Sequence, residues 1–263
     1  MPDFIKNRSG KSLATTLAPR SKRSGSGQVN SLWVGGASEI VATGGTITSY
    51  TVGGINYKSH TFTSTSTFTV SEVPDGAVAD IWVVAGGGGA GFDRGGGGGA
   101  GGAKTVTGIA LNAQAYTITI GGAGGLGINV APGSNGGSSS GLGQSTSGGG
   151  YGSANNYAGN VGGSGGGQAS GISGEGNAGG ANNSDDGAGG GGKGGAGASG
   201  VPVGSGNGGA AGTNDYQDGT SRSYAAGGGG SIGTSPASEY GRGGKGNTNA
   251  SIQAGVVIIR YKV

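Results

Sequence analysis

The chain lacks most of the side chains that catalysis and metal binding require. Its 263 residues include no cysteine and one histidine, His60, so disulfides, thiolate metal sites and paired-histidine metal sites are excluded. Charged residues make up 10% and hydrophobic residues 32% of the chain, which is little of either for a typical enzyme. We therefore expect no catalytic residues, no bound metal and no cofactor.

Long apolar runs are also missing. No stretch approaches the roughly 20 apolar residues of a membrane-spanning helix. Residues 1–30 lack the apolar centre of a signal peptide. We therefore expect a protein that is made in the cytoplasm without Sec-type export.

Glycine is what the chain has in excess. Residues 121–250 hold 49 of the 73 glycines, whereas average usage is about 7%. Glycine loses more conformational freedom on folding than any other residue. Such a block either stays disordered or adopts a fold that only glycine permits, and the scarcity of charge from residue 121 to residue 175 argues against disorder.

The glycines recur at a spacing of three in several places, such as Gly121, Gly124 and Gly127. Three residues per turn is the period of the extended left-handed helix of polyproline and collagen chains. Positions without side chains let such helices approach closely, so that backbone hydrogen bonds replace a hydrophobic core. A collagen triple helix is excluded because the chain has only six prolines.

Flanking segments have the composition of β-strands. Residues 46–52, 57–70, 79–85, 104–111, 115–120 and 256–263 are rich in threonine, β-branched residues and aromatics. Phe62, Phe68 and His60 share one parity in the second run, which predicts one buried face. The run at 79–85 is apolar throughout and predicts a strand that is buried on both faces.

The last of these strands follows the glycine block directly, so we expect it to return to the sheet that begins before residue 120. The predicted fold is mostly β plus polyglycine II. A small antiparallel β-sandwich of residues 37–120 and 252–263 carries residues 121–251 as a long insertion of packed polyglycine II helices. Residues 1–36 form a separate basic arm.

The arm has a net charge of +5 over residues 1–23, while the rest of the chain has a net charge of −2. We expect it to attach the protein to a larger assembly, and a frayed, solvated terminus is the alternative. Nucleic acid is not expected because the interleaved aromatics of a single-strand binder are absent. The candidate attachment residues are Lys6, Arg8, Lys11, Arg20, Lys22, Arg23 and Trp33.

Glycine richness also creates motifs that do not carry chemistry. Residues 86–102 match the dinucleotide-binding pattern, but no helix-forming run follows to hold a pyrophosphate. The carboxylate pairs Asp185 with Asp186 and Asp215 with Asp218 lie among asparagines and glycines, which indicates solvated turns more than a glycosidase pair or a calcium loop.

Tyrosines interrupt the glycine block together with Asn, Ser, Asp and Arg. That mixture is typical of adaptable binding loops. Because a bundle of bare helices has no apolar core, we expect these rings at loop tips or on the bundle surface, with packing on the β-domain as the alternative. The candidate receptor-binding residues are Tyr151, Tyr157, Tyr216, Arg222, Tyr224, Tyr240 and Arg242.

The strand segments together resemble a family of glycine-rich domains of bacteriophage tail fibres and related virion proteins. The matching pieces, which span roughly residues 45–263, are residues 60–63 with 67–70, 81–89, 116–121 and 255–261. The island layout is also similar to the tip adhesins of T-even-like phages, in which a sandwich of polyglycine II helices presents loops that bind outer-membrane proteins or surface sugars of the host.

This resemblance implies a non-enzymatic protein of the phage tail, located in the virion. Its partners would be other virion proteins and a host outer-membrane protein or surface glycan, and it would act as a homo-oligomer such as a trimer or as a monomer on a trimeric fibre. A purely structural virion component that binds no receptor is the alternative. An ice- or polysaccharide-binding protein and a polysaccharide depolymerase are further alternatives.

Overall fold

The computed structural model describes residues 37–263 except for residues 155–156, 183–186, 202–204 and 249. The predicted arm, with all its attachment candidates, lies outside the described residues. The described part contains no helix, and therefore none long and apolar enough to cross a membrane. Its strands are β1 (Val41–Thr43), β2 (Thr46–Val52), β3 (Ile55–Phe62), β4 (Ser66–Glu72), β5 (Val78–Val84), β6 (Ala103–Ala110), β7 (Ala115–Ile118), β8 (Ser139–Gly141), β9 (Gln144–Thr146), β10 (Gly212–Asn214), β11 (Arg222–Tyr224) and β12 (Val256–Lys262).

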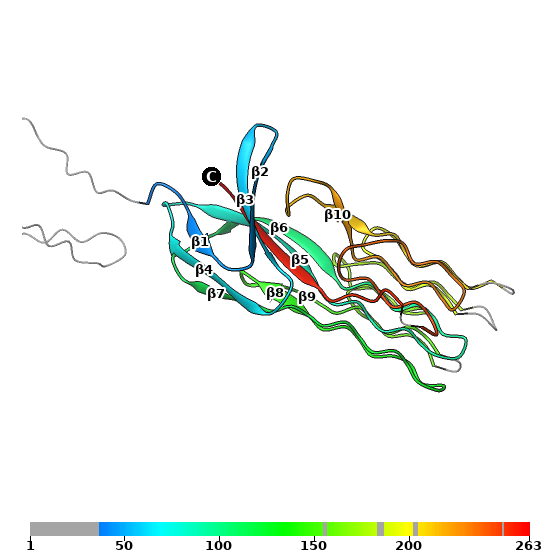
Figure 1. Cartoon of the computed structure of the whole chain (residues 1–263). Coiled ribbons are helices and arrows are strands. Elements are labelled where there is room, and N and C mark those ends of the chain that lie inside the picture. Colours follow the sequence, from blue (N-terminus) through cyan, green and yellow to red (C-terminus); the bar gives the residue numbers. More distant parts are fainter. Residues whose placement is uncertain (1–36, 155–156, 183–186, 202–204, 249) are drawn as a thin grey trace, which may run out of the picture. The chain divides into compact units, whose positions relative to one another are not determined.

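Two antiparallel sheets are built from the segments that flank the glycine block (Figure 1). One has the order β2-β3-β12-β5-β6 and the other has the order β1-β4-β7. Strand β12 lies at the centre of the larger sheet, where it pairs with β3 through Val257–Phe62 and with β5 through Val256–Val84. The predicted return of the last strand to the first sheet is therefore confirmed.

The larger sheet is covered on both faces. On one face Phe62, Ile81 and Val257 share a core cluster with Phe68 and Ile118 of the smaller sheet. On the other face Trp82, Val84 and Ile258 pack against Tyr216 and Tyr224, which belong to the long insertion. Because both faces are covered, β5 and β12 carry nearly continuous apolar runs. Such runs are more common in parallel sheets, whose strands are usually buried on both faces.

The predicted strand at residues 57–70 is wrong as a single element. The chain bends at residues 63–65, so β3 joins the larger sheet and β4 joins the smaller one. Polar Thr63, Ser64 and Thr65 are exposed at this bend. The shared parity is confirmed, because His60, Phe62 and Phe68 are all buried between the two sheets.

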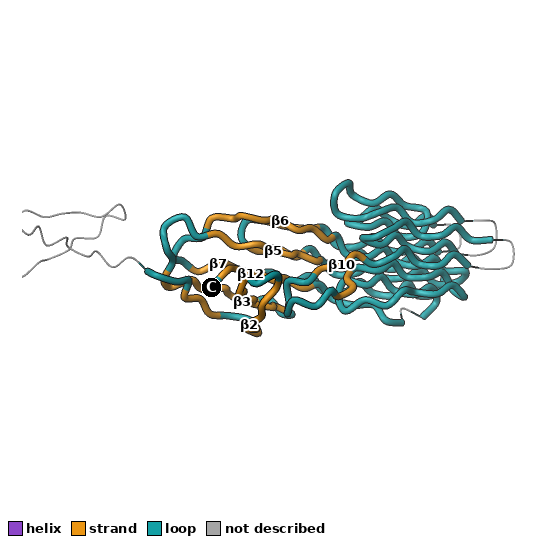
Figure 2. The backbone as a smooth tube through the Cα atoms, turned by 90° about the horizontal axis from the view of Figure 1, so that it is seen from above, coloured by secondary structure: helices purple, strands orange, loops and turns teal. Residues whose placement is uncertain are grey.

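The remaining segments form what we call the glycine-rich region: the described parts of residues 86–102, 119–138, 147–211 and 225–255. They run back and forth beside one another and extend away from the sheets (Figure 2). Residues 86–102, which the prediction assigns to the β-sandwich, bond to this region throughout. Because their glycines lack side chains, backbones of neighbouring segments pack closely against them. Residues 86–102 therefore pack with the glycine-rich insertion.

Hydrogen bonds in this region follow a period of three. Successive N–H groups from residue 96 to residue 102 donate to three neighbouring segments in rotation, at 2.7–2.9 Å. Gly96, Gly99 and Gly102 donate to the carbonyls of Ser153, Gly150 and Ser147, Gly97 and Ala100 to those of Ala188 and Gly191, and Gly98 and Gly101 to those of Gly244 and Gly241. Each segment is therefore bonded in three directions, unlike a strand in a sheet, which has two neighbours.

Close approach explains why these positions are glycine. A Cβ added to Gly98 would lie 2.0 Å from the carbonyl oxygen of Gly88, and one added to Gly121 would lie 1.9 Å from that of Gly137. Gly122, by contrast, is exposed, with nothing within 4 Å of an added Cβ. The spacing of Gly121, Gly124 and Gly127 thus corresponds to one inward-facing row, since all three are buried.

Candidate recognition surface

Chain reversals gather at the end of the glycine-rich region that lies away from the sheets (Figure 1). They are closed by short backbone bonds, such as Gly91 N–H to Gly96 O at 3.1 Å and Ala131 N–H to Ile128 O at 3.0 Å. Exposed apolar side chains occupy these reversals. We call the set Phe92, Ile128, Val130, Tyr157, Val201 and Ile232 the distal surface.

Hydrogen bonds connect neighbouring reversals of the distal surface. The N–H of Gly127 donates to Ala90 O, and the N–H of Asn247 donates to Gly91 O. Asn247 also accepts from the N–H of Gly95 through its side chain, at 2.9 Å. A further contact, 2.9 Å between the hydroxyls of Ser205 and Ser231, ties two more reversals together. The reversals are therefore joined into one end of the region.

The backbone at the distal surface is held in tight turns. Asp93, Arg94, Asn129 and Asn247 have φ values of 55°, 57°, 54° and 62°. Few residues other than glycine adopt this left-handed conformation, and asparagine and aspartate do so most readily. These turns adjoin three of the apolar residues, Phe92, Ile128 and Val130.

The six described side chains that define the distal surface are apolar or aromatic. Exposure ranges from 39% for Phe92 to 71% for Ile128. Among the described residues, the sequence neighbours of Phe92, Ile128 and Ile232 include Asp93, Asn129 and Ser231. Exposed apolar groups that gather at one end of a molecule are typical of protein interaction sites.

Of the seven predicted receptor-binding residues, Tyr157 lies on the distal surface, with 55% of its area exposed. Tyr151 is half-buried along a glycine segment, where its N–H donates to Asn135 Oδ1. Arg242 donates to the carbonyls of Ser251 and Pro236, and burial lowers the pKa of its guanidinium.

Tyr216 and Tyr224 are not at the surface. They are 6% and 0% exposed, so the expectation that the tyrosines lie at loop tips is wrong for these two. Tyr224 meets Trp82 edge-on at 5.9 Å and stacks on half-buried Tyr240 at 6.4 Å, and burial raises the pKa of its hydroxyl. The rings find an apolar surface on the larger sheet, which is the packing alternative of the sequence analysis.

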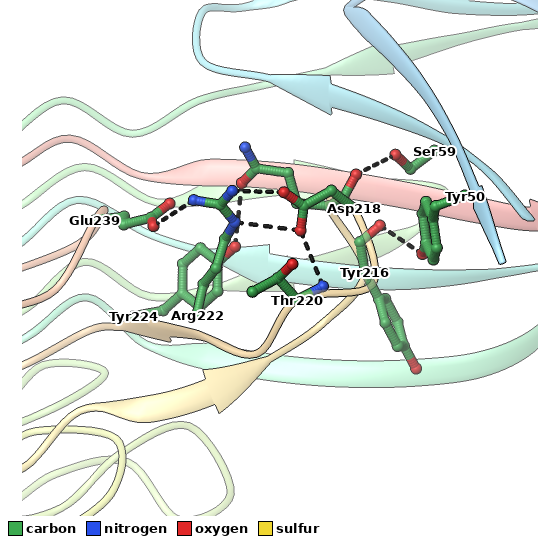
Figure 3. A network of polar contacts seen from close by, with 9 residues as sticks. Tyr50, Ser59, Tyr216, Asp218, Thr220, Arg222, Tyr224 and Glu239 are labelled. Atoms are coloured by element: carbon green, nitrogen blue, oxygen red, sulfur yellow. Dashed lines mark hydrogen bonds and ion pairs between the residues drawn. The ribbon is translucent and has the colours of Figure 1, made fainter. Parts of the chain in front are cut away.

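Figure 3 shows how residues 215–222 are fixed to the larger sheet. The Tyr50 hydroxyl donates to Tyr216 O at 2.8 Å, and the Ser59 hydroxyl donates to Gln217 O at 2.6 Å. Arg222 forms ion pairs with Asp218 and Glu239. The bond from Arg222 lowers the pKa of the Asp218 carboxyl. Arg222 is thus neutralised within the chain and is poorly suited to bind an external anion.

The carboxylates that the sequence analysis considered have structural partners or fall outside the described residues. Asp215 pairs with Arg260 at 3.3 Å and Asp218 pairs with Arg222. Asp185 and Asp186 are outside the described residues. In the part of the chain that the structure describes, no three His, Asp or Glu side chains are grouped so as to hold a metal ion.

Sequence comparison gives the chain a family. Residues 61–262 match the family model described as a glycine-rich domain. The chain belongs to the glycine-rich domain family. The match runs from the end of β3 through β12, so it contains β4 to β12 and the whole glycine-rich region, whereas β1 and β2 precede it.

A search of curated proteins gives no match. The description of the glycine-rich domain family names a composition and no activity. The comparisons therefore assign no activity to the distal surface or to any other part of the chain. Apart from Tyr157, the apolar members of the distal surface are missing from the sequence-based site. Their signal in the sequence is a lone apolar residue beside Asp, Asn, Pro or Ser within a glycine run, as at Phe92, Ile128 and Ile232.

Proposed function

We propose that the glycine-rich region is a bundle of polyglycine II helices. Three observations support this: N–H groups that rotate among three neighbours with a period of three, backbone contacts too close for a Cβ, and the absence of any positive φ from Gly86 to Gly91 and from Gly95 to Gly102. A left-handed helix with three residues per turn has these properties. In such a bundle backbone hydrogen bonds hold the segments together, and the structure is stiff without a large apolar core.

We further propose that the protein is a non-enzymatic component of a bacteriophage tail fibre or tail tip that recognises the host surface. In this proposal residues 1–36 attach it to other virion proteins, the two sheets anchor the glycine-rich region, and the distal surface contacts a host outer-membrane protein or surface glycan. The observation that carries the proposal is the set of six exposed apolar side chains at the end away from the sheets. Leaving such groups in water has no benefit for a monomer's stability.

A purely structural virion role is the second candidate. It is favoured by Tyr216, Arg222 and Tyr224, because these three predicted receptor residues instead fix residues 215–222 to the larger sheet. In that case the distal surface would contact another virion protein or nothing.

The test is binding of the labelled full chain to a panel of Gram-negative cells. A variant with Phe92→Ser, Ile128→Ser, Tyr157→Ser and Ile232→Ser removes most of the distal surface. The matched control carries Val41→Ser, Val78→Ser, Val161→Ser and Ile172→Ser, at positions that are also exposed but lie outside the distal surface. We expect wild type and control to bind the same strains and the distal variant to lose binding.

Equal binding by the distal variant would contradict recognition through this surface. If no strain retains the wild-type chain, the structural role is favoured. Thermal unfolding of all three proteins checks that the substitutions leave the fold intact, as is usual for exposed positions.

A further inference from the structure

The outer edge of strand β2 is an unprotected sheet edge. Strand β2 (Thr46–Val52) is the first strand in the order β2-β3-β12-β5-β6, so β3 is its one neighbour in that sheet. It pairs with β3 over all seven residues without a shift of register. Its sequence, TITSYTV, contains no charge, no proline and no glycine. A regular, uncharged, β-branched edge is a template for pairing with another strand.

The other edge strands of the two large sheets are β6, β1 and β7, and each is short or interrupted. Strand β6 (Ala103–Ala110) carries Lys104, a register shift opposite residues 79–81, and Gly108 with φ of 70°. Strand β1 has three residues and a register shift. Just beyond β7, Thr119 bridges to Ser140 of β8. Bulges, charges, short strands and covering segments are the usual ways in which proteins block edge pairing. Strand β2 has seven residues, no bulge and no charge.

The turn after β2 determines which of its backbone groups face outward. Gly53 and Gly54 have φ values of 59° and 78°, which is a two-residue hairpin turn of type I′. Val52 and Ile55, which close this turn, therefore exchange hydrogen bonds, and the pairs alternate from there. The N–H and C=O groups of Ile47, Ser49 and Thr51 consequently point away from β3.

No side chain of the described residues covers the outer edge of β2, which is exposed to solvent. Residues 46, 47, 49 and 51 are exposed, and Ile47 has 48% of its area in contact with solvent. The loop that contains Gly219 covers one face of β2 at Tyr50 and Val52. The outward backbone groups of Ile47, Ser49 and Thr51 keep no partner among the described residues.

We propose that β2 pairs antiparallel with β2 of a second copy of this chain. The twofold axis would pass through Ser49, with Ile47 opposite Thr51 and Thr46 opposite Val52. The three outward residues of each copy would then exchange hydrogen bonds, and the two five-stranded sheets would become one continuous sheet. The dimer is independent of the host-recognition proposal, since it uses the sheet and not the distal surface.

Charge favours a second copy as the occupant. In a twofold pair each residue of β2 is placed near its own equivalent or near another residue of β2, so any charge on the strand would be repeated across the axis. The strand has none. The charged residue on the neighbouring strand is Lys58, which lies opposite Ser49 on β3. Its equivalent would lie three strand spacings away, roughly 14 Å, and is screened at physiological salt.

The test is sedimentation velocity of the full chain over a wide range of protein concentration. We expect a dimer whose dissociation constant rises by about tenfold or more in Ser49→Lys, because two like charges then face each other on the axis. The matched control is Thr107→Lys, which adds the same charge at an exposed position on the opposite edge strand β6. We expect it to dimerise as wild type does.

Disulfide cross-linking is a second measurement, and it does not depend on the stability of a lysine variant. The chain has no cysteine of its own, so only an introduced thiol can react. In Ser49→Cys the two introduced thiols would face each other at the roughly 5.5 Å Cα separation of a hydrogen-bonded pair, which a disulfide can span. We expect oxidation to give a covalent dimer with Ser49→Cys and none with Thr107→Cys.

Several outcomes would overturn the proposal. A wild-type chain that stays monomeric at every concentration excludes the pairing. A dimer that Ser49→Lys leaves unchanged places the interface elsewhere, and a trimer excludes a twofold pair. Failure of Ser49→Cys to cross-link while the chain is dimeric would also contradict the proposed axis.

Discussion

The guanidinium carbon of Arg260 lies 3.6 Å from the centroid of the Tyr216 ring. Arg260 belongs to the central strand β12, and Tyr216 belongs to the loop between β10 and β11. The same guanidinium carbon lies 4.6 Å from the centroid of the Tyr57 ring, and the guanidinium pairs with Asp80 and Asp215. One side chain thus connects the larger sheet with the long insertion through two cation–π contacts and two ion pairs.

Tyr216→Ala should lower the free energy of unfolding by about 3 kcal/mol. It leaves a cavity where a buried ring was, and it removes one of the two aromatic rings that contact the Arg260 guanidinium. Urea unfolding followed by circular dichroism measures the change. Tyr157→Ala is the matched control. Its ring is 55% exposed, and we expect a change within about 0.5 kcal/mol. Equal stabilities of the two variants would contradict a structural role for Tyr216.

Gly121→Ala and Gly122→Ala should differ sharply although the two positions are adjacent. The added Cβ meets the Gly137 carbonyl oxygen at 1.9 Å in the first case and nothing within 4 Å in the second. We expect Gly121→Ala to cost about 3 kcal/mol, at the upper end of what overpacking costs. Gly122→Ala should be neutral or slightly stabilising. Thermal unfolding of both variants checks the difference, and equal melting temperatures would contradict the close packing.

Acid should destabilise the sandwich through His60. The ring is fully buried, with Nδ1 2.7 Å from Gly44 O and Nε2 3.1 Å from the Tyr261 hydroxyl. Burial lowers the pKa of His60, and nearby Lys58 lowers it further, whereas the Gly44 carbonyl opposes the shift. The unfolded chain therefore binds a proton at a higher pH than the folded chain does.

It follows that the stabilisation is complete above the ordinary histidine pKa of about 6.5 and is lost as the pH falls below it. The slope for one proton is at most about 1.4 kcal/mol per pH unit. We expect the free energy of unfolding to fall between pH 6.5 and pH 5 in wild type. In His60→Gln the same curve should be nearly flat over this interval, even if that variant is less stable throughout. Parallel curves would exclude His60 as the source.

Asp218→Asn should have a small, salt-dependent effect. Asp218 and Arg222 retain 28% and 30% side-chain exposure in their ion pair, and partly exposed pairs contribute about 0.5 kcal/mol. We expect the loss to shrink in high salt, because screening weakens the pair in wild type. Urea unfolding at two salt concentrations measures this. A large, salt-independent loss would indicate that the carboxylate is needed for the shape of residues 215–222.

Side-chain patterning made the sheets predictable. β-branched runs identified the strands of the larger sheet, and the shared parity of Phe62 and Phe68 identified side chains that are buried between the two sheets. The place of β12 was predictable because an apolar strand at residues 256–262 needs two covered faces. The bend at residues 63–65 was missed because its threonines and serines continue the alternation of the flanking strands.

The packing of the glycine segments was not predictable in the same way. A bare backbone has no pattern that distinguishes one neighbour from another, so the partners of residues 86–102 could not be inferred. The positions of the tyrosines were mispredicted for a related reason. Tyr216 and Tyr157 both follow polar residues in the sequence, but Tyr216 packs on the larger sheet whereas Tyr157 is exposed.

The position of β12 has a consequence for biosynthesis. Its partners on β3 are about two hundred residues earlier, as His60 and Tyr261 are separated by 201 positions. The larger sheet therefore cannot close until the ribosome has translated residue 262 and the tunnel has released it. Until then β3 and β5 remain without their shared neighbour, and a nascent chain that stops within the glycine block never acquires the centre of its sheet.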